Sequence, residues 1–301
     1  MNRAARPRLA AGLVVPALAF PLLALCAALA PRAARAADAP GVLFPVSFTI
    51  EHALTQTDAD GSQFRTDAVT DTYGGSNLVS VRPGGSRVIV DFARREVTEV
   101  SVEKSTYWTL SFSQMSDLAR RLAAAEQRPM VPKRAPAPLA TAAPVVKVEE
   151  IDAGRERQPL ASGLPASRAG TRHFRASVEN GPAADVWVDG TVRLTPTALD
   201  ALEAFERDVL GAASKNDVPV SALAAAARRA ASGAVPVRVL RSLSAGRGTS
   251  DDTALSLTPL PVFPQKLLVV GDGFRRVASP LESMVAFAEE EASRDSSRLV
   301  K

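Results

Sequence analysis

The chain has 301 residues, enough for one large domain or two small ones, and its 46% hydrophobic and 23% charged residues are ordinary for a globular protein. A single cysteine excludes both a disulfide framework and a thiolate metal cluster, and two histidines exclude a metal site with three histidine ligands. The formal net charge of +4 and the pI of about 9.6 leave nucleic-acid binding to be examined.

The N-terminal segment has the pattern of a secretory signal peptide. Arginines precede an apolar run over 9–30, and the small-x-small sequence Ala34-Arg35-Ala36 follows it. An uncleaved membrane anchor is the alternative, but Pro16 and Pro21 interrupt the run. The sequence therefore predicts a signal peptide over 1–36, cleavage after Ala36 and a periplasmic location.

Removal of this segment changes the charge. It holds five of the 36 basic residues and none of the 32 acidic ones, so the remaining chain has a net charge of −1. No cluster of Lys and Arg remains, and we expect no nucleic-acid partner. The lone cysteine, Cys26, also lies in the removed segment, and a mature chain without thiols suits an oxidising compartment.

The first part of the mature chain reads as a meander of strands. Apolar residues at every second position from Val46 to Leu54 predict a half-buried antiparallel strand with His52 on its apolar face. Asp58–Gly61 is typical of a hairpin turn. Further strands are predicted at 64–73, 78–82, 87–92, 97–103 and 106–112.

Helices and strands mix in the rest of the chain. A helix is predicted after Ser113 or Ser116, followed by a Pro/Ala-rich insertion over 128–144. Thr195 is placed to cap a helix that begins at Pro196. Other strands are predicted at 145–151, 172–178, 185–189, 235–242 and 253–258. Further helices are predicted at 221–231 and from the capping box Ser279–Glu282 to about Ala292. The segment 293–301 is predicted to be a flexible tail.

These elements predict a single α+β domain over 37–292. About ten or eleven antiparallel strands form one sheet, with three or four helices gathered on one side. A sheet of that size has to curl to keep its apolar face dry, so we expect a curved half-barrel wrapped around the helices.

Motifs for catalysis are missing. His52 and His173 are the two candidate bases, and no nucleophile-elbow sequence accompanies either of them. The paired acids Asp251 and Asp252 are adjacent on a predicted strand, so they point to opposite faces and do not converge on a substrate. The sequence predicts no catalytic residue, no metal ligand and no cofactor. A hydrolase centred on one of the histidines is the alternative.

Several segments together carry a resemblance to a known family, namely Val88–Asp91, Val97–Val102, Lys104–Trp108, Arg172–Arg175, Ala184–Val188, Val235–Val239, Phe263-Pro264 and Gly273–Val277. In these segments the chain resembles an uncharacterised bacterial periplasmic family related to the LolA-like lipoprotein carriers. The resemblance implies a half-barrel of antiparallel strands curled around helices, with a cavity that receives the acyl chains of lipids or lipoproteins.

The resemblance thus implies a carrier that binds a hydrophobic ligand between sheet and helices and meets the membrane only transiently. The alternative is a protein-interaction or envelope-stress module on the same fold, with an envelope protein as its partner and no ligand. An open apolar cavity would favour the carrier and a filled interior would favour the module. Apolar residues on the predicted strands are the candidate cavity residues, namely Phe48, Ile50, Trp108, Leu110, Phe112 and Val237.

Overall fold

A computed structural model describes residues 42–126, 146–151, 171–178, 181–210, 220–242 and 248–299 of the chain. The predicted signal peptide over 1–36, its cleavage site and the predicted insertion over 128–144 lie outside the described residues.

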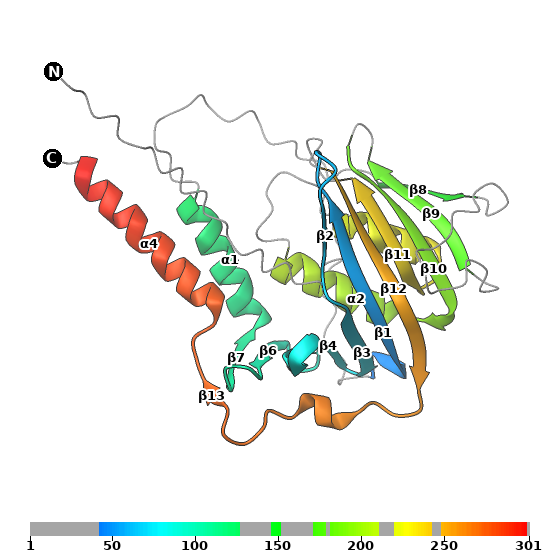
Figure 1. Cartoon of the computed structure of the whole chain (residues 1–301), viewed down its shortest axis with the longest axis horizontal. Helices are drawn as coiled ribbons and strands as arrows, with labels where there is room; N and C mark the ends of the chain where they lie inside the picture. The colour runs from blue at the N-terminus through cyan, green and yellow to red at the C-terminus, as the bar shows by residue number, and fades with distance from the viewer. Residues whose placement is uncertain are drawn as a thin grey trace.

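A thirteen-stranded sheet forms the body of the described structure (Figure 1). Its strand order is β13-β7-β6-β5-β4-β3-β1-β12-β11-β10-β9-β8, with the short β2 paired to β1. The strands are β1 (Phe44–Thr57), β2 (Gln63–Arg65), β3 (Val69–Gly75), β4 (Asn77–Val81), β5 (Arg87–Asp91), β6 (Glu96–Ser101), β7 (Thr106–Ser111), β8 (Val146–Ile151), β9 (Thr171–Val178), β10 (Ala183–Arg193), β11 (Ala234–Ser242), β12 (Thr249–Leu260) and β13 (Arg275–Arg276).

Four α-helices accompany the sheet: α1 (Phe112–Glu126), α2 (Pro196–Phe205), α3 (Val220–Ala230) and α4 (Pro280–Leu299). A π-helical turn, Glu206–Leu210, continues α2. Helix α4 continues past the end that the sequence predicts near Ala292, because neither glycine nor proline follows to stop it.

The α+β class is confirmed, and the sheet differs from the prediction in three respects. It has thirteen strands because β13 is added and because the strand predicted over 64–73 is divided into β2 and β3. The sheet is mixed, since β13 pairs with β7 in parallel while the other pairs are antiparallel. It is also open, with β13 at one edge and β8 at the other.

One face of the sheet carries the main core. A single cluster of buried side chains joins strands β1, β3–β7 and β10–β12 to helices α1, α2 and α4. Helix α3 packs on β9–β11 through alanines and Leu223. The small alanine side chains let this helix approach the sheet closely, which accounts for the Ala-rich sequence there.

The opposite face of β4–β6 is covered by the chain that follows β12. Phe263 packs against Val79, Ile89 and Val100, and Leu267 and Phe274 flank them. This segment runs along the bottom of Figure 1, from β12 to β13. Its apolar residues have neither a helical nor a strand period, so the sequence pattern does not predict this packing.

Two predicted helix starts are confirmed at atomic detail. The backbone N–H of Ala198 donates to Thr195 Oγ1 at 3.1 Å at the start of α2. At the start of α4 the N–H of Glu282 donates to Ser279 Oγ at 3.1 Å, and the N–H of Ser279 donates to a Glu282 carboxylate oxygen at 2.6 Å. These bonds satisfy N–H groups that a helix leaves free at its first turn.

Gly233 ends α3 in a conformation that requires glycine. Its φ is +79°, and a Cβ added there would lie 2.3 Å from the carbonyl oxygen of Leu194. We expect Gly233→Ala to lower the free energy of unfolding by about 2 kcal/mol or more, measured by urea unfolding. The control is Gly61→Ala, where φ is +84° and nothing lies within 4 Å, so that only about 1 kcal/mol of backbone strain applies. Equal losses in the two variants would contradict the contact with Leu194.

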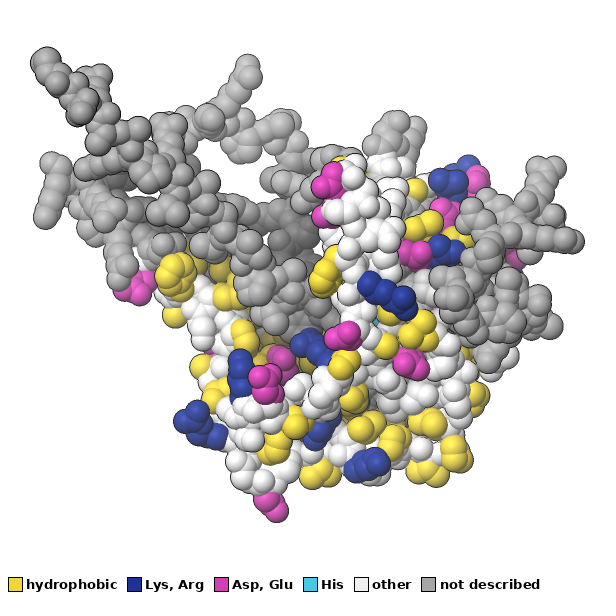
Figure 2. All heavy atoms as spheres, in the orientation of Figure 1, with side chains coloured by type: hydrophobic (Ala, Val, Ile, Leu, Met, Phe, Trp, Pro, Cys, Tyr) yellow, Lys and Arg dark blue, Asp and Glu magenta, His cyan; other side chains and the backbone are white. Residues whose placement is uncertain are grey.

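Charged side chains of both signs are interspersed on the face shown in Figure 2 and do not gather by sign. Within the described ranges, none of the helices combines the length and the apolar character needed to cross a bilayer.

Candidate functional site

A buried histidine lies where the two halves of the sheet meet. Strand β1 pairs with β3 on one side and with β12 on the other, so it joins the strands β3–β7 to the strands β8–β12. The register between β1 and β12 shifts between Glu51 and His52. The candidate site is built around this point.

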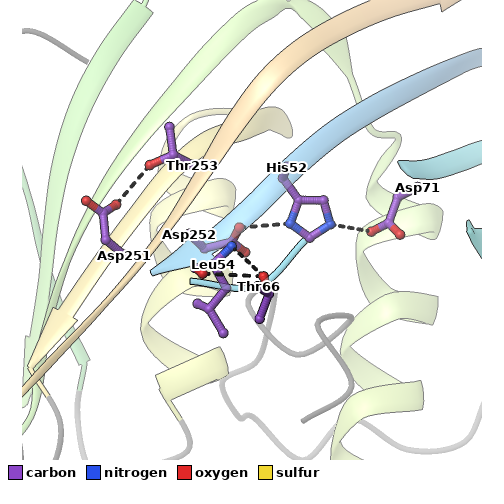
Figure 3. Close-up of polar contacts among 7 residues, drawn as sticks. All are labelled: His52, Leu54, Thr66, Asp71, Asp251, Asp252 and Thr253. Carbon is purple, nitrogen blue, oxygen red and sulfur yellow. Dashed lines mark hydrogen bonds and ion pairs between the residues drawn. The ribbon is translucent and has the colours of Figure 1, made fainter. Parts of the chain in front are cut away.

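His52 is held between two carboxylates from the neighbouring strands (Figure 3). Its Nδ1 lies 2.8 Å from Asp252 Oδ1 on β12, and its Nε2 lies 3.3 Å from Asp71 Oδ2 on β3. All three side chains are buried, with about 8% or less of each exposed. We call this group the His52 cluster.

The two acids raise the pKa of His52. Burial by itself lowers the pKa of a histidine, but the charge and hydrogen bond of Asp252, followed by those of Asp71, outweigh it, so that the pKa of His52 is raised well above its ordinary value. Each ring nitrogen faces a carboxylate. This arrangement suits an imidazolium that links three strands, whereas a general base needs a nitrogen that faces its substrate.

The adjacent acids of β12 point to opposite faces of the sheet, as the strand pattern predicts. Asp252 points to His52, while Asp251 points the other way and accepts a hydrogen bond from Thr253 (Figure 3). Asp251 also binds Arg238 through two hydrogen bonds of 3.0 and 2.7 Å.

A small pocket adjoins the His52 cluster. His52, Asp71 and Asp252 form its polar side, and Phe48, Ile50, Tyr73 and Val237 belong to its apolar wall. The cavity measures about 20 Å3, which is room for one or two water molecules. In the conformation described, the interior at this place is therefore filled by side chains.

The six predicted cavity residues divide into two groups. Phe48, Ile50 and Val237 line the pocket. Trp108, Leu110 and Phe112 do not: they are buried in the main core farther along the sheet, where Phe112 packs against Phe205 with ring centroids 4.9 Å apart. All six are buried, and only the first three meet at one cavity.

Further charged groups are buried close to the site. Arg228 on α3 is fully buried, and burial lowers the pKa of its guanidinium while the charge of Glu206 opposes that shift. Burial raises the pKa of Glu206 well above its ordinary value. Burial and the charge of Asp71 likewise raise the pKa of Tyr73. Burial lowers the pKa of the Arg241 guanidinium, and the charge of Asp252 opposes that shift.

The second histidine belongs to the other face of the sheet. His173 pairs in register with Trp187, and the rings stack with centroids 4.3 Å apart. The guanidinium of Arg238 also lies over the ring of Trp187, 4.9 Å from its centroid. Nε2 of His173 is 3.1 Å from Asp185 Oδ1. The two histidines therefore do not form one site.

The sequence pattern alone does not identify Asp71 and Asp252 as partners of His52. A signal was present: Val69, Asp71 and Tyr73 alternate on one strand face, which puts an acid among apolar side chains. A buried acid needs a partner, and the histidine on the apolar face of β1 is the complementary group. The described residues contain no group of His, Cys, Asp and Glu side chains arranged to hold a metal ion.

Comparisons with known proteins provide no assignment. No protein-family model matches the sequence, and no curated protein matches it. Among solved structures, an uncharacterised conserved protein from Thermus thermophilus is similar over 76% of this chain and 89% of its own, with 7% identity and a TM-score of 0.34. PNGF-II is similar over 81% of this chain at 9% identity with a TM-score of 0.35, and this chain spans only about a third (33%) of its length. Likenesses this slight support no conclusion about function.

Proposed function

We propose that this chain is an exported periplasmic protein that binds the apolar chain of a lipid or lipoprotein between its sheet and its helices. The observation that carries the proposal is the convergence of Phe48, Ile50 and Val237 on one pocket at the helix-facing side of the sheet. The resemblance to LolA-like carriers, with their curved half-barrel, and the signal-peptide pattern add to it.

Binding requires the pocket to open. A cavity of about 20 Å3 does not hold an acyl chain, so side chains and the helices above them have to move when the ligand enters. Leu194 lines the pocket and leads directly into the N-cap of α2. We propose that α2 moves away from the sheet when the ligand enters.

The binding of N-phenyl-1-naphthylamine, a neutral probe that fluoresces in apolar surroundings, tests this proposal. Val237→Phe fills the pocket, and we expect it to weaken probe binding about tenfold, whereas Val237→Ala enlarges the pocket and should strengthen binding. Val269→Phe is the matched control, because Val269 is exposed and lies outside the pocket. Equal affinity in wild type and both Val237 variants would contradict the proposal.

A protein-interaction or envelope-stress module is the second candidate, and the filled interior favours it. Such a module needs no cavity, and its partner would be an envelope protein. It predicts that wild type does not bind the probe and that a protein partner is recovered reproducibly with the mature chain.

A further inference from the structure

One carboxylate oxygen of the pocket lining has no hydrogen-bond partner. It is Asp71 Oδ1, which is buried, and the buried Ser80 Oγ, outside the lining, also has no partner among the described residues. The two residues are directly opposite each other in the register of β3 and β4, so they share a face with the His52 cluster. A buried carboxylate oxygen without a donor is costly, and it marks a place for a donor group.

His52 contacts only one oxygen of each acid in the lining. It lies 3.3 Å from Asp71 Oδ2 and 2.8 Å from Asp252 Oδ1, so Asp71 Oδ1 stays available to a donor. Arg238 also lines the pocket, but its guanidinium is bound by Asp251.

Two more arginines lie outside the lining. Burial lowers the pKa of both guanidiniums, and the charges of Asp252 on Arg241 and of Glu206 on Arg228 oppose that shift. A carboxylate or phosphate seated against Asp71 Oδ1 would bring oxygens of like charge together and leave that oxygen without a donor.

The size of the cavity limits the polar group that fits it. Phe48 and Tyr73 line the pocket and stack on each other with centroids 4.6 Å apart and planes 8° apart. The cavity beside them measures about 20 Å3, which is the size of a water molecule or an ammonium group.

We propose that the pocket selects a ligand whose polar end is an ammonium group, seated as a hydrogen-bond donor against Asp71 Oδ1. This proposal rests on the proposed function, since it names the polar end of the apolar ligand. The alkyl chain of that ligand extends along Ile50 and Val237 once the interface has opened.

Competition among dodecylammonium, dodecanol and dodecanoate for N-phenyl-1-naphthylamine at pH 7 tests this selectivity. We expect dodecylammonium to bind at least tenfold more tightly than dodecanoate, with dodecanol between them. Asp71→Asn should reduce the ratio of the ammonium to the carboxylate affinity to about threefold or less. Because the ratio is measured within one variant, a loss of folded protein does not change it.

Glu51→Gln is the matched control. It removes a carboxylate from the residue next to His52, on the opposite face of β1, and should leave the ratio unchanged. Equal binding of the three compounds, or a ratio unaffected by Asp71→Asn, would overturn the ammonium site and leave the proposed function standing. Probe binding that none of the three compounds displaces would overturn the ammonium site alone. A failure of the probe itself and of all three compounds to bind would overturn both.

Discussion

Replacing His52 with leucine is expected to lower the free energy of unfolding by about 3–5 kcal/mol. The substitution removes the imidazolium and leaves Asp71 and Asp252 buried without their counter-charge. Because a whole domain is stable by about 5–15 kcal/mol, this loss is a large part of the total. Urea unfolding of the purified mature protein, followed by circular dichroism, measures it.

Two comparisons show whether the unpaired acids cause the loss. The triple variant His52→Leu/Asp71→Leu/Asp252→Leu removes all three charges, and we expect it to recover most of the stability that His52→Leu loses. Arg120→Ala breaks the exposed ion pair with Asp117 and should change stability by less than about 0.5 kcal/mol. A His52→Leu variant as stable as wild type would show that the cluster is not a stabilising link.

The His52 cluster also predicts how stability depends on pH. The folded pKa of His52 is raised, so its contribution is fully present below the unfolded pKa of about 6.5 and is lost as pH rises through the folded value. Between these two values stability should fall by up to about 1.4 kcal/mol per pH unit. Glu206, whose pKa is also raised, adds a fall that begins above its unfolded value of about 4.5.

The triple variant isolates the share of the cluster. It keeps Glu206, Tyr73, Arg228 and Arg241, so the difference between its stability and that of wild type reports on His52 and its two acids, including the effect of those acids on Tyr73 and Arg241. As the pH is raised from 6 to 10, we expect the free energy of unfolding of wild type, measured in urea titrations, to fall relative to that of the triple variant. A difference that is constant over this range would contradict a raised pKa for His52.

Local patterns were sufficient to predict most of the fold. Alternation predicted β1, and the chemistry of Thr195 and of Ser279 with Glu282 predicted the starts of two helices, because these signals act within a few residues. The parallel pair β13–β7 was missed, because it joins residues about 170 positions apart through a segment with no regular period.

The candidate site was predicted only in part, for a related reason. Membership of a strand face follows from alternation, so Phe48 and Ile50 were correctly placed on an inward face. Which strands lie side by side does not follow from alternation, and the pairing of β1 with β12 joins His52 to a residue 200 positions away. For the same reason Trp108 and Val237 were grouped together, although they lie in different parts of the sheet.

Native mass spectrometry of the protein expressed from the full-length sequence and purified without detergent tests the central claim most directly. A carrier should retain a lipid or acyl-chain adduct, lose it on exchange with an excess of dodecylammonium, and retain less of it in Val237→Phe. A spectrum with only the unliganded mass, unchanged by added dodecylammonium or dodecanol, would contradict ligand binding and favour the protein-interaction module.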